Sequence, residues 1–158
     1  MEWPAEFYAW REGTACPLCE EGRPDETSHG VRYFAGEVAD AYLVRADIQR
    51  GLSFVVFRGR HVVEPTELTD VEAAAHGREV MRVARALLEV LAPVKLNYDV
   101  LGNSVPYLHT HIVPRYADDP RPGWPFPFPD PDPGPMPGPR LIADVEALRR
   151  AIGGDYIP

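Results

Sequence analysis

The sequence YLHTHIVPR, residues 107–115, decides both the fold and the chemistry of this chain. If the segment forms a β-strand, side-chain alternation places Tyr107, His109 and His111 on one face and the intervening residues on the other. Two imidazoles then project side by side from a rigid element, and each titrates near neutral pH, which suits a nucleophile or a proton carrier. Taken alone, the pair is also consistent with two metal ligands or with two unconnected surface histidines.

The segment before this strand predicts a second strand and a turn. Residues 94–100 have a strand-like composition and residues 102–104 are typical of a turn, so the two strands can form a hairpin. Asn97, Asn103 and Ser104 supply short neutral amide and hydroxyl groups of the kind that hold a phosphate without positive charge. The alternative is an ordinary turn that favours these residue types.

The clearest helix is expected to follow Thr69, which forms a capping box with Glu72 and precedes an apolar stripe at helical spacing. Pro93 follows the stripe and should end the helix. Strands are also predicted over residues 31–38, 40–45 and 52–57, and a last helix over residues 140–152.

Proline occupies about every second position between residues 120 and 139, which excludes a helix or a central strand there. We expect an extended strap that closes over a substrate or, as is more common, covers an apolar face. The chain therefore divides into an irregular N-terminal arm (1–30), a core (31–119), and the strap with the C-terminal helix (120–158).

The bulk composition argues against several classes of partner. The formal net charge is -8, which disfavours nucleic acid and anionic membranes as partners. The longest apolar runs, such as residues 52–57, are too short to span a bilayer. The N-terminus lacks the basic start and apolar segment of a signal peptide, so a cytoplasmic location is expected.

Two cysteines are present, and they form a C-x-x-C pair at Cys16 and Cys19. In a reducing cytosol this spacing indicates half of a metal site or a redox pair rather than a structural disulfide. The alternative is two unrelated small residues in a turn.

Residues 97–115 resemble the signature of the histidine triad (HIT) superfamily, in which His-φ-His-φ-His-φ-φ is often followed by Pro-Arg. The resemblance covers roughly residues 37–116 and is closest to bacterial dinucleoside polyphosphate hydrolases. It includes Gly51 before a strand and His61 after that strand. Tyr107 stands where the family has its first histidine, whereas His109 and His111 hold the second and third positions.

The resemblance implies an α+β fold, with an antiparallel sheet and one long helix packed on it, and a homodimer. It also implies that His109 attacks the α-phosphorus of a nucleotide and forms a covalent nucleotidyl-histidine, without a cofactor in the chemistry. The substrate would be a phosphoanhydride or phosphoramidate, such as a dinucleoside polyphosphate, cleaved by hydrolysis or transfer. The residues expected to hold the phosphate oxygens are His111, Asn97, Asn103 and Ser104.

Two other functions stay open at this point. One is a nucleotide-binding regulatory protein with little or no turnover, an alternative suggested by Tyr107 and by the long strap. The other makes His109 and His111 ligands of a catalytic metal, and it ranks last because the sequence places no carboxylate or third histidine suitably.

Some family members hold a structural zinc with a C-x-x-C pair, a histidine after the central strand, and the first motif histidine. Cys16, Cys19 and His61 match three of these positions. Tyr107 holds the fourth, and a phenol is a poor zinc ligand. The expectation is either a structural zinc or the relic of a lost site, and the His109 chemistry does not depend on which.

The nucleoside end of the site is less defined. In many family members a carboxylate or amide near the end of the second strand contacts the ribose. The matching position falls near Val44, which cannot do so, and the nearest polar residues are Asp47 and Gln49.

Overall fold

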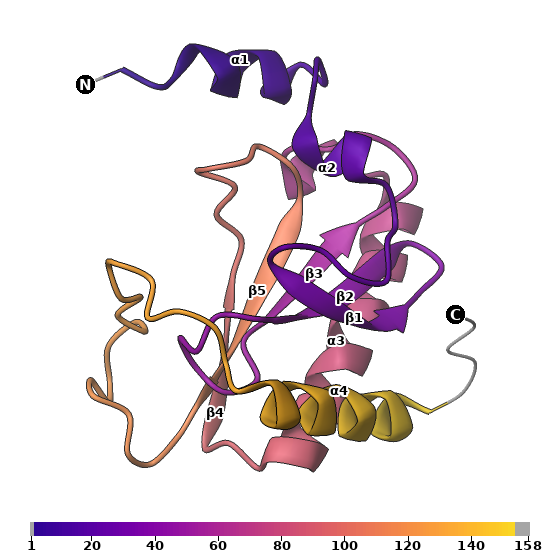
Figure 1. Ribbon diagram of the computed structural model, residues 1–158. Coiled ribbons are helices and arrows are strands. Elements are labelled where there is room, and N and C mark those ends of the chain that lie inside the picture. Colours follow the sequence, from indigo (N-terminus) through magenta and orange to yellow (C-terminus); the bar gives the residue numbers. More distant parts are fainter. Residues whose placement is uncertain (1, 154–158) are drawn as a thin grey trace.

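Residues 2–153, as described by a computed structural model, fold around one antiparallel sheet of five strands (Figure 1). The strand order is β1-β2-β3-β5-β4. The strands are β1 (Gly30–Ala35), β2 (Ala39–Val44), β3 (Ser53–Phe57), β4 (Lys95–Asp99) and β5 (His109–Arg115). The helices are α1 (Ala5–Arg11), α2 (Pro17–Glu21), α3 (Asp70–Leu91) and α4 (Gly138–Ile152), with a short 3-10 turn at η1 (Pro65–Glu67). The α+β fold expected from the sequence is confirmed.

Helix α3 begins where the capping box predicts. The Thr69 hydroxyl accepts a hydrogen bond from the backbone N–H of Glu72, and the Glu72 carboxylate accepts one from the N–H of Thr69. The helix ends at Ala92, which adopts a left-handed conformation just before Pro93. Its buried stripe, which includes Val83 and Leu87, belongs to the main apolar core together with residues of the sheet.

Two features differ from the expected pattern. Helix α4 packs against both α3 and β1, so two helices rather than one cover this face of the sheet (Figure 1). The arm before β1 contains the short helices α1 and α2 instead of being wholly irregular. Neither helix buries a residue along its length, so neither produces the apolar periodicity that would predict it. No helix within residues 2–153 is long and apolar enough to cross a membrane.

The face of the sheet opposite α3 and α4 is partly polar, and a buried carboxylate lies on it. Asp40 is fully buried and accepts hydrogen bonds from Arg23 at 2.7 and 2.9 Å and from Arg58 at 3.1 Å. Arg32 lies 3.6 Å away. A buried carboxylate without such partners would strongly destabilise the fold. Arg23 belongs to the arm, so Asp40 fixes the arm to the sheet.

The proline-rich strap crosses the same face and is anchored along its length. Arg115, the last residue of β5, donates hydrogen bonds to the carbonyls of Trp124 at 2.8 Å and Arg121 at 3.2 Å. Phe126 packs against an apolar cluster that includes Val44 and Val113. As the sequence predicts, residues 120–137 contain neither a helix nor a ladder strand, but the predicted strap ends two residues early because α4 already begins at Gly138.

Gly51 provides a test of the packing between α3 and the sheet. Its φ is +82°, and a Cβ at this position would overlap the Leu91 side chain and lie 3.0 Å from Pro114. We predict that Gly51→Ala lowers the free energy of unfolding by about 2 kcal/mol or more, measured by urea denaturation. Gly77 in α3 has open space around it, so Gly77→Ala is the control and should stabilise by about 0.5–1 kcal/mol. Equal effects of the two substitutions would contradict this account.

Candidate active site

Strand β5 places two imidazoles next to each other on the face of the sheet away from α3 and α4. The ring centroids of His109 and His111 lie 4.9 Å apart. Phe54 of β3 packs against both rings, at 6.1 Å from His109 and 4.6 Å from His111. The alternation predicted from the sequence is therefore confirmed, and Tyr107 precedes the strand instead of belonging to it.

A backbone carbonyl determines the protonation of His109. Its Nδ1 lies 2.7 Å from the carbonyl oxygen of Tyr107. A carbonyl can only accept, so Nδ1 carries the proton and donates it, and Nε2 of the neutral ring keeps its lone pair. Burial lowers the pKa of His109, although the Tyr107 carbonyl acts in the opposite direction. The ring is therefore neutral at pH 7, with Nε2 available as a nucleophile.

His111 is held neutral more strongly. Burial, together with the neighbouring His109, lowers the pKa of His111 to about 4. Its Nδ1 is buried and has no hydrogen-bond partner within residues 2–153. A buried nitrogen without a partner is costly unless a ligand satisfies it. His111 can therefore form a polar contact with a molecule bound beside His109.

The two histidines lie at one end of a cavity of about 540 Å³, a volume within the usual range for small-molecule sites. The floor continues from β5 across β3 and β2 to Gly30 of β1. Residues 101–105 of the β4–β5 loop form one wall, and the N-terminal arm forms another. The cavity-lining residues are Pro17, Leu18, Glu21, Thr27, His29, Gly30, Tyr42, Phe54, Val56, Arg58, Leu101, Gly102, Asn103, Ser104, Val105, His109 and His111.

The structure brings most of the predicted phosphate-binding residues together. Asn103 and Ser104 line the cavity with His109 and His111. Asn97 does not line it, and its Oδ1 accepts a hydrogen bond from Arg115 at 2.6 Å. Asn97 thus has a different partner, although its position on β4 is the predicted one.

The two polar residues nearest the expected ribose position point elsewhere. Asp47 forms an ion pair with Arg140, and Gln49 donates hydrogen bonds to the carbonyl of Pro114 and to Asp119. Neither lines the cavity. In the arm, by contrast, Glu21 and His29 line the cavity and are exposed.

Arg58 is a cavity residue that sequence reasoning missed. Its side chain is buried and donates to Asp40 at 3.1 Å and to the Tyr42 hydroxyl at 3.2 Å. It is the only arginine or lysine among the described cavity-lining residues. Its position after a buried strand gives no signal, because the contacts that hold it come from distant parts of the chain.

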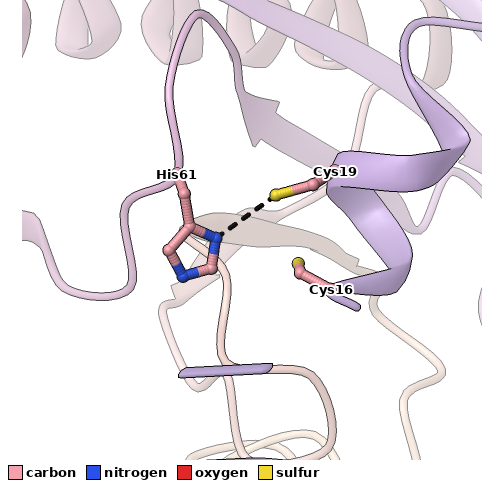
Figure 2. Close-up of side chains that lie close together, drawn as sticks. All are labelled: Cys16, Cys19 and His61. Atoms are coloured by element: carbon pink, nitrogen blue, oxygen red, sulfur yellow. Dashed lines mark hydrogen bonds between the residues drawn. The ribbon is translucent and has the colours of Figure 1, made fainter. Parts of the chain in front are cut away.

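A second cluster lies between α2 and the loop after β3. Cys16, Cys19 and His61 bring their ligand atoms within 4.8 Å of one another, and Figure 2 shows Cys19 and His61 pointing toward each other. The Cys19 sulfur lies 3.3 Å from Nδ1 of His61. Nε2 of the same ring lies 3.1 Å from the carbonyl of Arg11, so Nε2 carries the proton and Nδ1 faces the thiols with its lone pair. This tautomer is the one that a metal ion would need.

Tyr107 stands where a fourth zinc ligand would be expected, and its phenol is not in a form that coordinates a metal. Its ring packs against His61 at 5.5 Å, and its hydroxyl donates to the carbonyl of Arg60 at 3.3 Å. Burial raises the pKa of Tyr107, so the phenol stays protonated. Within residues 2–153, three donors therefore converge at this site.

Comparisons with known proteins agree with this geometry. The HIT domain family matches residues 42–118. A histidine triad protein from Bradyrhizobium japonicum is 30% identical, with a TM-score of 0.68, over 79% of this chain and 92% of that one. A histidine triad protein from Marinobacter aquaeolei is 23% identical, with a TM-score of 0.69, over 79% and 90%.

A Zn-bound histidine triad family protein from Mycobacterium smegmatis is 24% identical, with a TM-score of 0.57, over 87% of this chain and 91% of that one. At this level of identity, the Mycobacterium and Marinobacter proteins bear on the fold alone. Comparison with curated protein sequences found no match.

The lowered pKa values of the two histidines can be measured directly. We predict that His111 titrates near pH 4 and that His109 titrates below the usual value of about 6.5, because burial disfavours both imidazolium forms. NMR titration of the imidazole resonances, assigned with His109→Gln and His111→Gln, checks this prediction. A midpoint at or above about 6.5 for either ring would contradict the neutral, buried pair.

Proposed function

This chain belongs to the HIT domain family, and from that premise we propose that it is a nucleotide hydrolase or transferase acting through a covalent nucleotidyl-His109. The observation that carries the proposal is the Tyr107 carbonyl on Nδ1 of His109, which leaves Nε2 unprotonated beside the cavity. The proposed substrates contain a nucleotide phosphoanhydride or phosphoramidate, and dinucleoside polyphosphates are the leading class.

The proposed reaction consists of two displacements at phosphorus. Nε2 of His109 forms a bond to the α-phosphorus while the bond to the leaving group breaks, and the leaving group takes the electron pair. The ring becomes cationic, and the Tyr107 carbonyl accepting from Nδ1 stabilises that charge. Water, or a second phosphate, then displaces His109 and releases the nucleotide.

Four neutral side chains are proposed to hold the phosphate oxygens during these steps. Asn103, Ser104 and His111 line the cavity next to His109. Asn97 is the fourth candidate, through its amide NH2 only, because its oxygen accepts from Arg115. Donors of this kind act where negative charge develops, and removing one from a well-studied protease oxyanion hole costs about 2.7–4 kcal/mol.

The alternative function, a regulatory protein that binds nucleotides without turnover, rested partly on the change of the first motif histidine to Tyr107. The structure weakens that argument. The contact with His109 is made by the backbone carbonyl of Tyr107, which every amino acid possesses. The side chain instead packs against His61 of the cluster with Cys16 and Cys19.

We further propose that the protein is a cytoplasmic homodimer. Its core comprises residues 31–119, and the arm (1–30) forms one wall of the cavity of this core. The strap and the last helix (120–158) follow the core. Strand β4 lies at an edge of the sheet and, with its flanks, exposes the apolar side chains of Val94, Tyr98 and Val100. An apolar edge is suited to pairing with a second copy. The net charge of -8 argues against nucleic acid as a partner.

We also propose that Cys16, Cys19 and His61 bind a structural zinc ion. The donor set fits three of its four positions, since the thiols and Nδ1 of His61 converge and Nε2 is held by a carbonyl. Burial and a hydrogen bond with Cys16 raise the pKa of the Cys19 thiol to about 11. When bound, the metal would link α2 to the loop after β3, because its ligands come from both.

The zinc proposal predicts uptake of about one zinc per chain by metal-free protein, measured by competition with a chromogenic chelator. Cys19→Ser should weaken binding by at least about tenfold, because a hydroxyl is a poorer zinc ligand than a thiolate. His109→Ala is the control and should bind zinc as the unmodified protein does. Uptake that is absent, or unchanged by Cys19→Ser, would rule out this site.

The catalytic proposal predicts that His109→Ala lowers turnover by at least about 1,000-fold, because the proposed intermediate forms on Nε2 of this ring. Release of nucleoside monophosphate from a panel of diadenosine polyphosphates and adenosine phosphoramidate measures this change. Nucleotide binding, followed by equilibrium dialysis, should survive. Thr110→Val, a nearly isosteric change on the helix-covered face of β5, should leave turnover within about twofold.

Retention of turnover by His109→Ala would end the proposed mechanism. Binding without turnover in the unmodified protein would favour the regulatory function instead. Activity that is lost to chelators and restored by metal, in Cys19→Ser as well as in the unmodified protein, would favour the catalytic-metal alternative.

A further inference from the structure

The strap brings an aromatic ring to the catalytic histidines. Phe128 lies with its ring centroid 6.2 Å from that of His111, within the range of interacting aromatic pairs. The rings of His109, His111 and Phe128 therefore form a continuous row that begins at the nucleophile. Phe128 lies outside the region that matches the HIT domain, which ends at residue 118.

Contacts of the neighbouring residues hold Phe128 in place, although its own ring is not buried. Its neighbour Phe126 packs into the apolar cluster at Val113 and contacts the Phe128 ring edge-on at 5.3 Å. Arg115 holds the strap through two backbone carbonyls, at Trp124 and Arg121. The alternating prolines further limit backbone motion. Phe128 is nevertheless 42% exposed, so a face of its ring is available to a ligand.

The position of Phe128 relative to the cavity indicates which part of a substrate it meets. No residue of the strap lines the cavity, which extends from His109 across the sheet to the arm. That cavity has room for the nucleoside of the transferred nucleotide. In an in-line displacement the leaving group departs from phosphorus on the side opposite the nucleophile. Phe128 contacts His111 from outside that cavity, so the part of a substrate that extends beyond the transferred nucleotide is the part that can meet its ring.

We propose that Phe128 forms the leaving-group subsite and stacks on the second nucleobase of a dinucleoside polyphosphate. This inference rests on the proposed function and names its substrate class. The bond that breaks joins the α-phosphorus to the bridging oxygen. That oxygen keeps the electron pair, and the second nucleoside departs with its phosphate chain. Base stacking on an aromatic side chain is sequence-tolerant, so either purine is accepted.

The test compares two substrates that transfer the same adenylyl group. Diadenosine tetraphosphate has an aromatic leaving group, whereas adenosine phosphoramidate releases only ammonia. Phe128→Ala should lower kcat/KM for diadenosine tetraphosphate by about tenfold or more, mainly through KM, and leave the phosphoramidate within about twofold. Phe128→Trp should restore the lost activity. Tyr8→Ala, which removes an exposed aromatic ring of α1 far from β5 in the sequence, is the matched control and should change neither value.

Equal losses on both substrates would assign Phe128 a structural role and overturn the inference. No loss on either substrate would overturn it as well. If the unmodified protein cleaves neither substrate, the proposed function fails, and dialysis binding then decides the inference separately. In that case, Phe128→Ala should weaken binding of diadenosine tetraphosphate but not of AMP, and unchanged binding of both would reject the subsite.

Discussion

The side chains of strand β5 alternate between the two faces of the sheet, and this alternation is the constraint on which the rest of the structure depends. Ile112 is fully buried in the core with α3, while His109 and His111 face the cavity. A shift of one residue would turn the imidazoles toward α3 and turn the core residues toward the cavity. Because β5 lies between β3 and β4, neighbours on both sides fix its backbone. The neighbouring strands thus hold His109, the proposed nucleophile, in a rigid position, and the carbonyl just before the strand sets its tautomer.

The fold extends this site beyond the matched HIT region in two directions. On one side, the fully buried Asp40 pairs with Arg23 and Arg58 and so fixes the arm that forms a cavity wall. On the other side, Arg115 fixes the strap that carries Phe128. Both attachments use charged groups that are costly to leave unpaired when buried. His109 and His111 lie within the matched region, whereas most of the arm and the strap lie outside it.

Much of the fold followed from local sequence patterns. Three such predictions are confirmed: the capping box at Thr69, the pairing of β4 with β5, and the shared face of His109 and His111. Each could be made because it depends on residues close together in sequence. The arm's contribution to the cavity, the Arg58 contacts and the approach of Phe128 to His111 could not be predicted. Each joins segments far apart in the chain, and neither periodicity nor composition specifies such contacts. The roles of the site residues stay predictions.

The stereochemical course at phosphorus tests the central claim most directly. A substrate made chiral at the α-phosphorus by a sulfur atom can be hydrolysed in isotopically labelled water, and the configuration of the nucleoside thiophosphate product determined. Each in-line displacement inverts the centre, so attack by His109 followed by attack of water predicts net retention. Net inversion would mean that water displaces the leaving group in a single step, and it would contradict a covalent nucleotidyl-His109.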